Sequence, residues 1–153
     1  MSTFFDAGTR AELEARLERL TPDHRRRWGR MSPHQAVCHL TDSFTAVLGD
    51  RPLTTPRVPW YVRTAFVRFA ALTLPLPWPK GVTTAPEMDQ EDGGTPPEDF
   101  ERDRERLQTA MERFAARGGE GLEPHVVFGE LTAGEWGRWG YRHTDHHLRQ
   151  FGV

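Results

Sequence analysis

The amino-acid sequence predicts an all-α protein, a four-helix bundle that leaves room for an extra short helix and a long loop at one end. Apolar residues recur every three or four positions over most of the chain, as in amphipathic helices, whereas the alternation typical of strands is scarce. Capping residues, prolines and glycines divide this pattern into four or five segments, and no segment repeats another. A chain of 153 residues suits one continuous core, so residues 1–153 are predicted to form a single domain.

The first two helices are predicted from their apolar faces and start signals. The first begins near Thr9 and carries leucines at positions 13, 17 and 20 on one face. Ser32 followed by Pro33 marks the start of the second helix, because proline is well tolerated in a first helical turn. This helix runs to about Gly49. Its apolar stripe consists of Ala36, Leu40, Phe44 and Val47.

Proline- and glycine-containing segments separate the remaining helices. A third helix is expected over residues 60–74 and is stopped by prolines at positions 75, 77 and 79. Its inward-facing residues are predicted to be Val62, Ala65, Phe66, Phe69 and Leu72. A fourth helix opens at Glu98 or Asp99 and ends at Gly118. The last helix begins with a capping box, from Thr132 to Glu135.

The segment from Leu76 to Pro97 is longer than the connections usual in compact bundles, and such length more often serves a function. We expect it to cover one end of the bundle and to border the candidate site described below. Trp78 and Lys80 offer an aromatic wall with an adjacent cation, which could receive an anionic group of a ligand. The alternative is that Trp78 only pins the loop to the bundle.

Composition argues against several classes of partner and location. A net charge of -2 and a pI of about 6.4 give no reason to expect binding to nucleic acid or to an anionic membrane. The most apolar stretch, residues 58–78, is too interrupted by arginines and prolines to span a bilayer. The first residues lack the features of a signal peptide, and the one cysteine, Cys38, allows no intramolecular disulfide. We therefore expect a cytoplasmic protein.

Two histidines in the last helix are candidate metal ligands. His143 and His147 stand at positions i and i+4, so in a helix their imidazoles point the same way and can share one ion. On a 3.6-residue period they lie on one stripe together with Trp136, Trp139 and Gln150. The two tryptophans either wall a substrate pocket or pack in the core. The neighbouring His146 falls at the edge of this stripe, turned away from His147, and is expected to flank the site rather than to bind metal.

His39 on the second helix is the candidate third ligand. It shares a polar face with Gln35 and Asp42, which stand about one turn before and after it. Either residue could hydrogen-bond the ring nitrogen that the metal does not use and so fix the tautomer. Asp42 is also a tentative catalytic base. Cys38 lies about 100° around the helix from His39, so we expect it to be a buried packing residue.

These motifs resemble the DinB-like superfamily of helical-bundle proteins, over nearly the whole chain. They are most similar to a bacterial subgroup whose reaction is not assigned. The segments that carry the resemblance are Trp28–His39, Pro79–Pro86 and His143–Gly152. In that superfamily three histidines bind one divalent metal, and the matching positions here are His39, His143 and His147. Members of known activity are mostly transferases or isomerases that use bacillithiol, mycothiol or another low-molecular-weight thiol.

The resemblance and the histidine pattern together predict an enzyme with one divalent ion, in the class of thiol-dependent transferases or related hydrolases of small molecules. Zinc suits tetrahedral coordination by three histidines best, although nickel and iron also accept imidazole. The alternatives are a non-catalytic, stress-related module that binds metal or a small molecule, and a plain bundle whose histidines are incidental. The aromatic residues of the third helix exceed what one inward face needs, which favours a homodimer.

Overall fold

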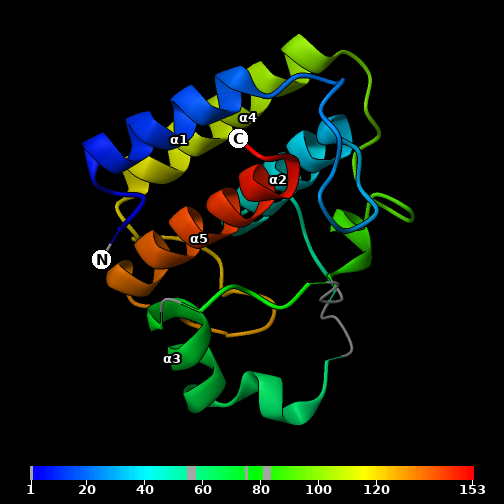
Figure 1. Ribbon diagram of the computed structural model, residues 1–153. Helices are drawn as coiled ribbons and strands as arrows, with labels where there is room; N and C mark the ends of the chain where they lie inside the picture. The colour runs from blue at the N-terminus through cyan, green and yellow to red at the C-terminus, as the bar shows by residue number, and fades with distance from the viewer. Residues whose placement is uncertain (1, 55–57, 75, 81–83) are drawn as a thin grey trace.

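The computed structural model describes residues 2–54, 58–74, 76–80 and 84–153. Over these residues the chain forms α-helices and two short 3-10 helices, with no strand, which confirms the predicted all-α class (Figure 1). The α-helices are α1 (Ala7–Arg19), α2 (Pro33–Val47), α3 (Ala65–Thr73), α4 (Phe100–Arg117) and α5 (Ala133–Phe151). The 3-10 helices are η1 (Trp60–Arg63) and η2 (Pro86–Met88).

Four of the helices, α1, α2, α4 and α5, form the bundle around one apolar core. Helix α2 packs against α4 and α5, and α1 packs against α5. The centre of the core is an aromatic cluster in which the ring centroids of Phe44, Phe114 and Trp139 are 5.1–5.7 Å apart. Gly140 allows this packing, because a Cβ atom at that position would come within 2.9 Å of the Phe114 ring. Helix α3 lies outside the bundle and contacts α5 (Figure 1).

Local capping signals set most of the helix ends where they were predicted. Ser32 caps α2 and Thr132 caps α5, each with the full capping box. Asp99 caps α4, which ends at Gly118 with the left-handed backbone that glycine tolerates. The start of α1 was predicted incorrectly, since Asp6 is its N-cap. The Asp6 carboxylate accepts the main-chain N–H of Thr9, which therefore lies inside the first turn.

The third predicted helix differs most from expectation. Thr64 accepts the N–H of Val67 and starts α3 anew, so residues 60–74 form η1 and α3 instead of one helix. Only Leu72 of α3 is buried. The side chains of Phe66 and Phe69, predicted to face inward, are 76% and 54% exposed. The physical reason is that α3 packs against α5 and η1 and, within the described residues, is not enclosed by the four helices of the bundle.

The long segment after α3 packs against the bundle. That it covers one end of the bundle stays a prediction. Trp78 packs against the main core, and η2 contacts α2. Pro75 and residues 81–83 of the predicted loop motif lie outside the described residues. Within the described part of the chain, no helix combines the length and apolar character needed to cross a bilayer.

Candidate metal centre

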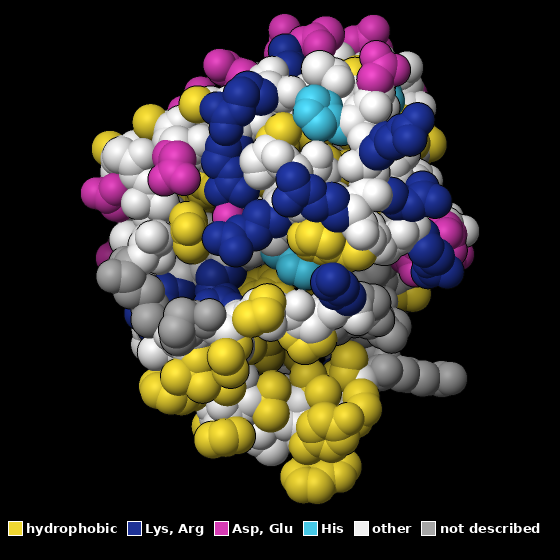
Figure 2. All heavy atoms as spheres, viewed as in Figure 1, with side chains coloured by type: hydrophobic (Ala, Val, Ile, Leu, Met, Phe, Trp, Pro, Cys, Tyr) yellow, Lys and Arg dark blue, Asp and Glu magenta, His cyan; other side chains and the backbone are white. Residues whose placement is uncertain are grey.

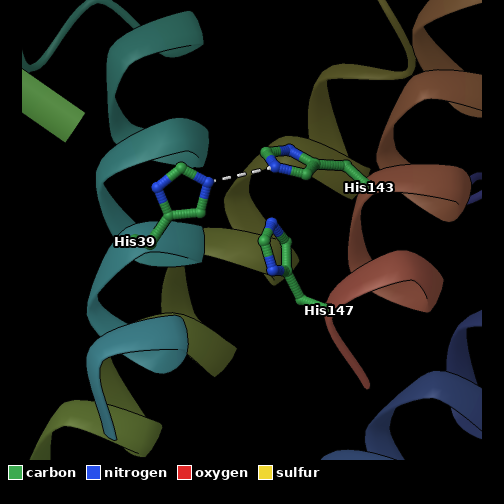
Figure 3. Close-up of side chains that lie close together, drawn as sticks. All are labelled: His39, His143 and His147. Carbon is green, nitrogen blue, oxygen red and sulfur yellow. Dashed lines mark hydrogen bonds between the residues drawn. The ribbon is translucent and has the colours of Figure 1, made fainter. Parts of the chain in front are cut away.

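Three histidine side chains converge between α2 and α5 (Figure 3). His39 comes from α2, and His143 and His147 come from successive turns of α5, so the rings of the α5 pair lie on one side of that helix. Their candidate ligand atoms all lie within 4.8 Å of one another, and the Nε2 atoms of His39 and His143 are 3.3 Å apart. The structure thus brings the three predicted ligands together. That they bind metal stays a prediction.

Hydrogen bonds fix the tautomers of two of the three rings. Nδ1 of His39 lies 2.8 Å from the main-chain carbonyl of Met88, which can only accept, so Nδ1 carries the proton. Nδ1 of His147 lies 3.1 Å from Oε1 of Gln150, whose amide nitrogen donates to the Trp28 carbonyl at 2.9 Å. Nδ1 of His147 is therefore also the donor. Both rings are left with the Nε2 lone pair available to a metal ion.

One further observation fits the three histidines to a divalent ion, the distance between two of their nitrogens. Nδ1 of His143, in contrast, is buried without a hydrogen-bond partner within the described residues, and an ion on Nε2 would leave it so. Nitrogens that bind one tetrahedral ion at about 2.0–2.1 Å lie about 3.3 Å apart. The Nε2 atoms of His39 and His143 have this separation. Imidazole lone pairs aimed at one point repel each other unless a cation or proton lies between them.

Burial keeps all three imidazoles in the neutral form that binds metal. It lowers the pKa of His39, and it lowers the pKa values of His143 and His147 well below the ordinary 6.5. The neighbouring imidazoles lower the last two pKa values further, since each charged ring would repel the others. At neutral pH the ring nitrogens need not lose a proton before they can act as ligands.

His146 lies beside the cluster and not in it, in agreement with the helical period. Its ring centroid is 5.2 Å from that of His147 and 5.9 Å from that of Trp28. Its side chain lines the adjoining cavity and is partly exposed.

The two residues predicted to orient His39 serve other purposes. Oε1 of Gln35 accepts the main-chain N–H of Ser32 and completes the cap of α2. The buried carboxylate of Asp42 pairs with Arg51 at 2.6 Å and accepts the N–H and hydroxyl of Thr95. The orienting group is instead the Met88 carbonyl, which belongs to η2 in the long loop. Asp42 holds two loops to α2, and this use of both oxygens leaves no support for its tentative role as a base.

A cavity of about 820 Å³ adjoins the histidines. Its walls combine α2 and α5 with loops and with the inner sides of η1 and α3, and it is large enough for a drug-sized molecule. The residues that close it near the histidines include Trp28, Trp78, Met88, His125, Trp139 and Gln150.

The tryptophans and Lys80 occupy different positions relative to the cavity and the core. Trp139 lines the cavity and packs on His143, with ring centroids 5.2 Å apart, whereas Trp136 is buried in the core. Trp78 anchors the loop and lines the cavity: its indole N–H donates to the Ala71 carbonyl, and its ring centroid lies 5.8 Å from that of His143. That it receives an anionic group of a ligand stays a prediction. The Lys80 ammonium lies over the ring of Trp28, not of Trp78, at 4.6 Å.

His125, in the loop between α4 and α5, also lines the cavity. Its Nδ1 accepts the main-chain N–H groups of Val127 and Phe128, both at 3.2 Å, so Nε2 carries the proton. Burial lowers its pKa to about 4, which keeps the ring neutral. The ring also packs on Trp139, at 5.7 Å between centroids. No local sequence pattern marks this residue, because its position beside the cavity depends on the path of the whole loop between α4 and α5.

A second group of polar side chains lies between α2 and α4. Asp103 accepts hydrogen bonds from His34 at 2.8 Å, from the Glu98 N–H at 3.1 Å and from Arg106 at 2.9 Å. Cys38 donates its thiol proton to the same carboxylate, and burial together with this negative neighbour raises the thiol pKa to about 12. The group is already satisfied by its own hydrogen bonds, and Cys38 is a buried packing residue as predicted.

Comparison with known proteins identifies a family whose function is described as unknown. No curated protein matches the chain, and no solved structure matches it. A family model described as a protein of unknown function (DUF1569) matches residues 5–152, which include all three converging histidines and both capping boxes. The chain therefore belongs to the DUF1569 family.

Proposed function

We propose that the protein binds one divalent ion through Nε2 of His39, His143 and His147 and acts as a metal-dependent enzyme on a small molecule. The reaction class that fits best is a thiol-dependent transfer, or a related transfer or hydrolysis. The observation that carries the proposal is the geometry of the three rings. Two of them have tautomers fixed with Nε2 unprotonated. The 3.3 Å separation of the His39 and His143 Nε2 atoms, which are hydrogen-bonded to each other in this structure, also matches the spacing on a tetrahedral ion.

The ion would supply Lewis acidity, since a cation favours the deprotonated form of a thiol or water beside it. Three protein ligands leave coordination open toward the cavity, as in catalytic rather than structural sites. Zinc suits this donor set best, and nickel and iron are the other candidates. A low-molecular-weight thiol is the proposed second cofactor, by resemblance alone.

The protein's own groups would bind and orient the reactants. Trp139 and Trp78 present aromatic surfaces beside His143, which suits an apolar acceptor. His125 is neutral and protonated on Nε2, so it can donate a hydrogen bond to a bound molecule without carrying charge.

Metal analysis of two matched variants tests the first half of the proposal. Wild-type protein incubated with zinc or nickel should retain about one ion per chain. His143→Ala should lose most of it, and His146→Ala should not, although both remove a histidine from α5 within one turn. Equal losses from the two variants would mean that the ligand pair is wrong. A wild-type protein that holds neither metal would remove the site.

Turnover tests the second half. Metal-loaded protein should catalyse transfer of a low-molecular-weight thiol to a chloro-aromatic, with release of chloride and a proton, or to an epoxide, whose ring oxygen takes the proton as the C–O bond opens. His147→Ala should abolish this activity. The competing function is a metal- or small-molecule-binding module without catalysis. It is favoured by one observation, that the carboxylate of Asp42 is fully engaged by Arg51 and Thr95 and offers no base to the site. Stoichiometric metal without turnover over a panel of thiols and acceptors would support this module.

A further inference from the structure

One end of the molecule exposes an apolar surface, here called the aromatic face. Within the described residues, every large hydrophobic side chain classed as exposed belongs to it. The members, with their exposed fractions, are Trp60 79%, Tyr61 53%, Phe66 76%, Phe69 54% and Leu76 59%. They gather over η1 and α3, at the lower end of the molecule in Figure 2. Apolar patches of this kind mark binding surfaces more often than they occur by chance.

The opposite side of η1 and α3 faces the interior of the protein. Val62, Val67 and Ala71 line the cavity, and Leu72 is buried in the core. The structure thus accounts for the inner side of η1 and α3 and leaves the aromatic face without a partner. Trp and Tyr are also the side chains that favour the boundary between water and a lipid bilayer.

Positive charge is concentrated in one part of the sequence, although the net charge of the chain is -2. Residues 51–86 contain five of the 20 Lys and Arg residues and none of the 22 Asp and Glu residues. Carboxylates from other segments pair with two of these five, since Arg51 bonds to Asp42 and Arg68 to Glu135. On the face seen in Figure 2, Lys and Arg side chains form a band above the aromatic face, whereas Asp and Glu side chains lie at the top and along both flanks and are absent from the aromatic face itself. Arg142 belongs to the border of the face, since its guanidinium donates to the main-chain carbonyls of Leu74 and Leu76, which are uncharged.

We infer that the aromatic face docks on a bilayer that contains anionic phospholipids. Its apolar side chains would enter the interface between headgroups and acyl chains, while the cations at its border contact lipid phosphates. The inference departs from the expectation of no membrane partner, because that expectation used only the overall charge. It is independent of the metal centre.

A second copy of the chain is the competing occupant, and charge disfavours it. A twofold axis through the aromatic face would bring two segments of the same sign together, each with its own Arg142 at the border. An anionic lipid surface instead satisfies the apolar and the positively charged groups at once.

Vesicle co-sedimentation tests the inference. Wild-type protein should bind vesicles of phosphatidylcholine with about one-third phosphatidylglycerol, and should not bind pure phosphatidylcholine. The pair Trp60→Ser and Phe66→Ser should lower the bound fraction by about tenfold or more. Both side chains are more than three-quarters exposed, so the fold should survive, and circular dichroism with a thermal midpoint checks this.

Two charge variants provide the matched control. Arg142→Gln, at the border of the face, should weaken binding several-fold. Arg102→Gln removes the same charge from an exposed position on α4, at the other end of the molecule, and should not. Equal binding to both vesicle types, or no binding to either, would overturn the inference. So would a wild-type dimer that the serine pair converts to a monomer without any vesicle binding.

Discussion

Replacing Gln150 with Leu removes the side chain that orients His147 while nearly keeping its volume. Gln150 accepts the Nδ1–H of His147 at 3.1 Å and donates to the Trp28 carbonyl at 2.9 Å. Both partners lose a hydrogen bond in a buried setting, and each such loss costs about 1–3 kcal/mol. Leucine regains part of this by burying its own apolar surface. The free energy of unfolding of the metal-free protein should therefore fall by about 2–4 kcal/mol.

The same substitution should weaken metal binding. Without the bond to Gln150, the His147 ring is free to rotate and its Nε2 lone pair is no longer held toward the other two nitrogens. Removing such an orienting partner typically costs 10- to 100-fold in affinity, or about 1.4–2.7 kcal/mol. The zinc dissociation constant, measured by competition with a chelator near neutral pH, gives this quantity. Urea unfolding in the presence of EDTA gives the stability of the metal-free protein separately.

Gln35→Leu is the matched control, because Gln35 also lines the cavity but bonds to the cap of α2 and to none of the histidines. It should cost about 1 kcal/mol of stability, as the loss of a cap does, and leave zinc affinity unchanged. If Gln150→Leu binds zinc as tightly as wild type, the orientation of His147 does not depend on Gln150 as reasoned here. Equal affinity losses in both variants would show a general loosening of the site.

Three further predictions concern other parts of the cavity and core. The pKa of His125 is about 4 when folded and 6.5 when exposed, so the unfolded chain takes up the proton first as pH falls. The metal-free protein should therefore lose up to roughly 3 kcal/mol of stability between pH 6.5 and 4, and His125→Asn should lose less in urea unfolding. Cys38, with a pKa of about 12, should react with iodoacetamide about 100-fold more slowly in folded than in unfolded protein, by mass spectrometry. Trp78→Ala and Lys80→Ala should each weaken binding of a low-molecular-weight thiol by about threefold to tenfold in fluorescence titration, with metal content unchanged.

Helix positions and the pairing of His143 with His147 could be predicted because both depend on local geometry. A capping side chain and the N–H group it accepts are three residues apart, so Ser32, Asp99 and Thr132 act in the folded protein as their sequence neighbourhoods indicate. Residues four apart in a helix share a face wherever the helix lies. The start of α1 was misplaced by a single turn for lack of a second local signal, and the start of α3 at Thr64 was missed.

The groups that hold the candidate ligands could not be predicted in the same way. Met88 orients His39 across 49 residues of sequence, and His125 lines the cavity from the loop between α4 and α5. Asp42 was predicted to hydrogen-bond His39 on the same helix, but its carboxylate bonds to Arg51 and Thr95 instead. Periodicity shows which side of a helix is apolar or polar, and it contains no information on which loop covers that side.

The sequence by itself determined the helical class, most helix ends and the three histidines, because each follows from hydrogen bonds and periodicity within a few residues. The tertiary structure alone decided three other features: the tautomers of His39 and His147, the shape of the cavity, and the outward direction of the aromatic residues of α3. Each of these depends on which segments meet in space. The direction of α3 shows the difference most clearly, since an apolar helix in an otherwise polar chain is expected inside, and only its position beside α5 leaves Phe66 and Phe69 in contact with solvent.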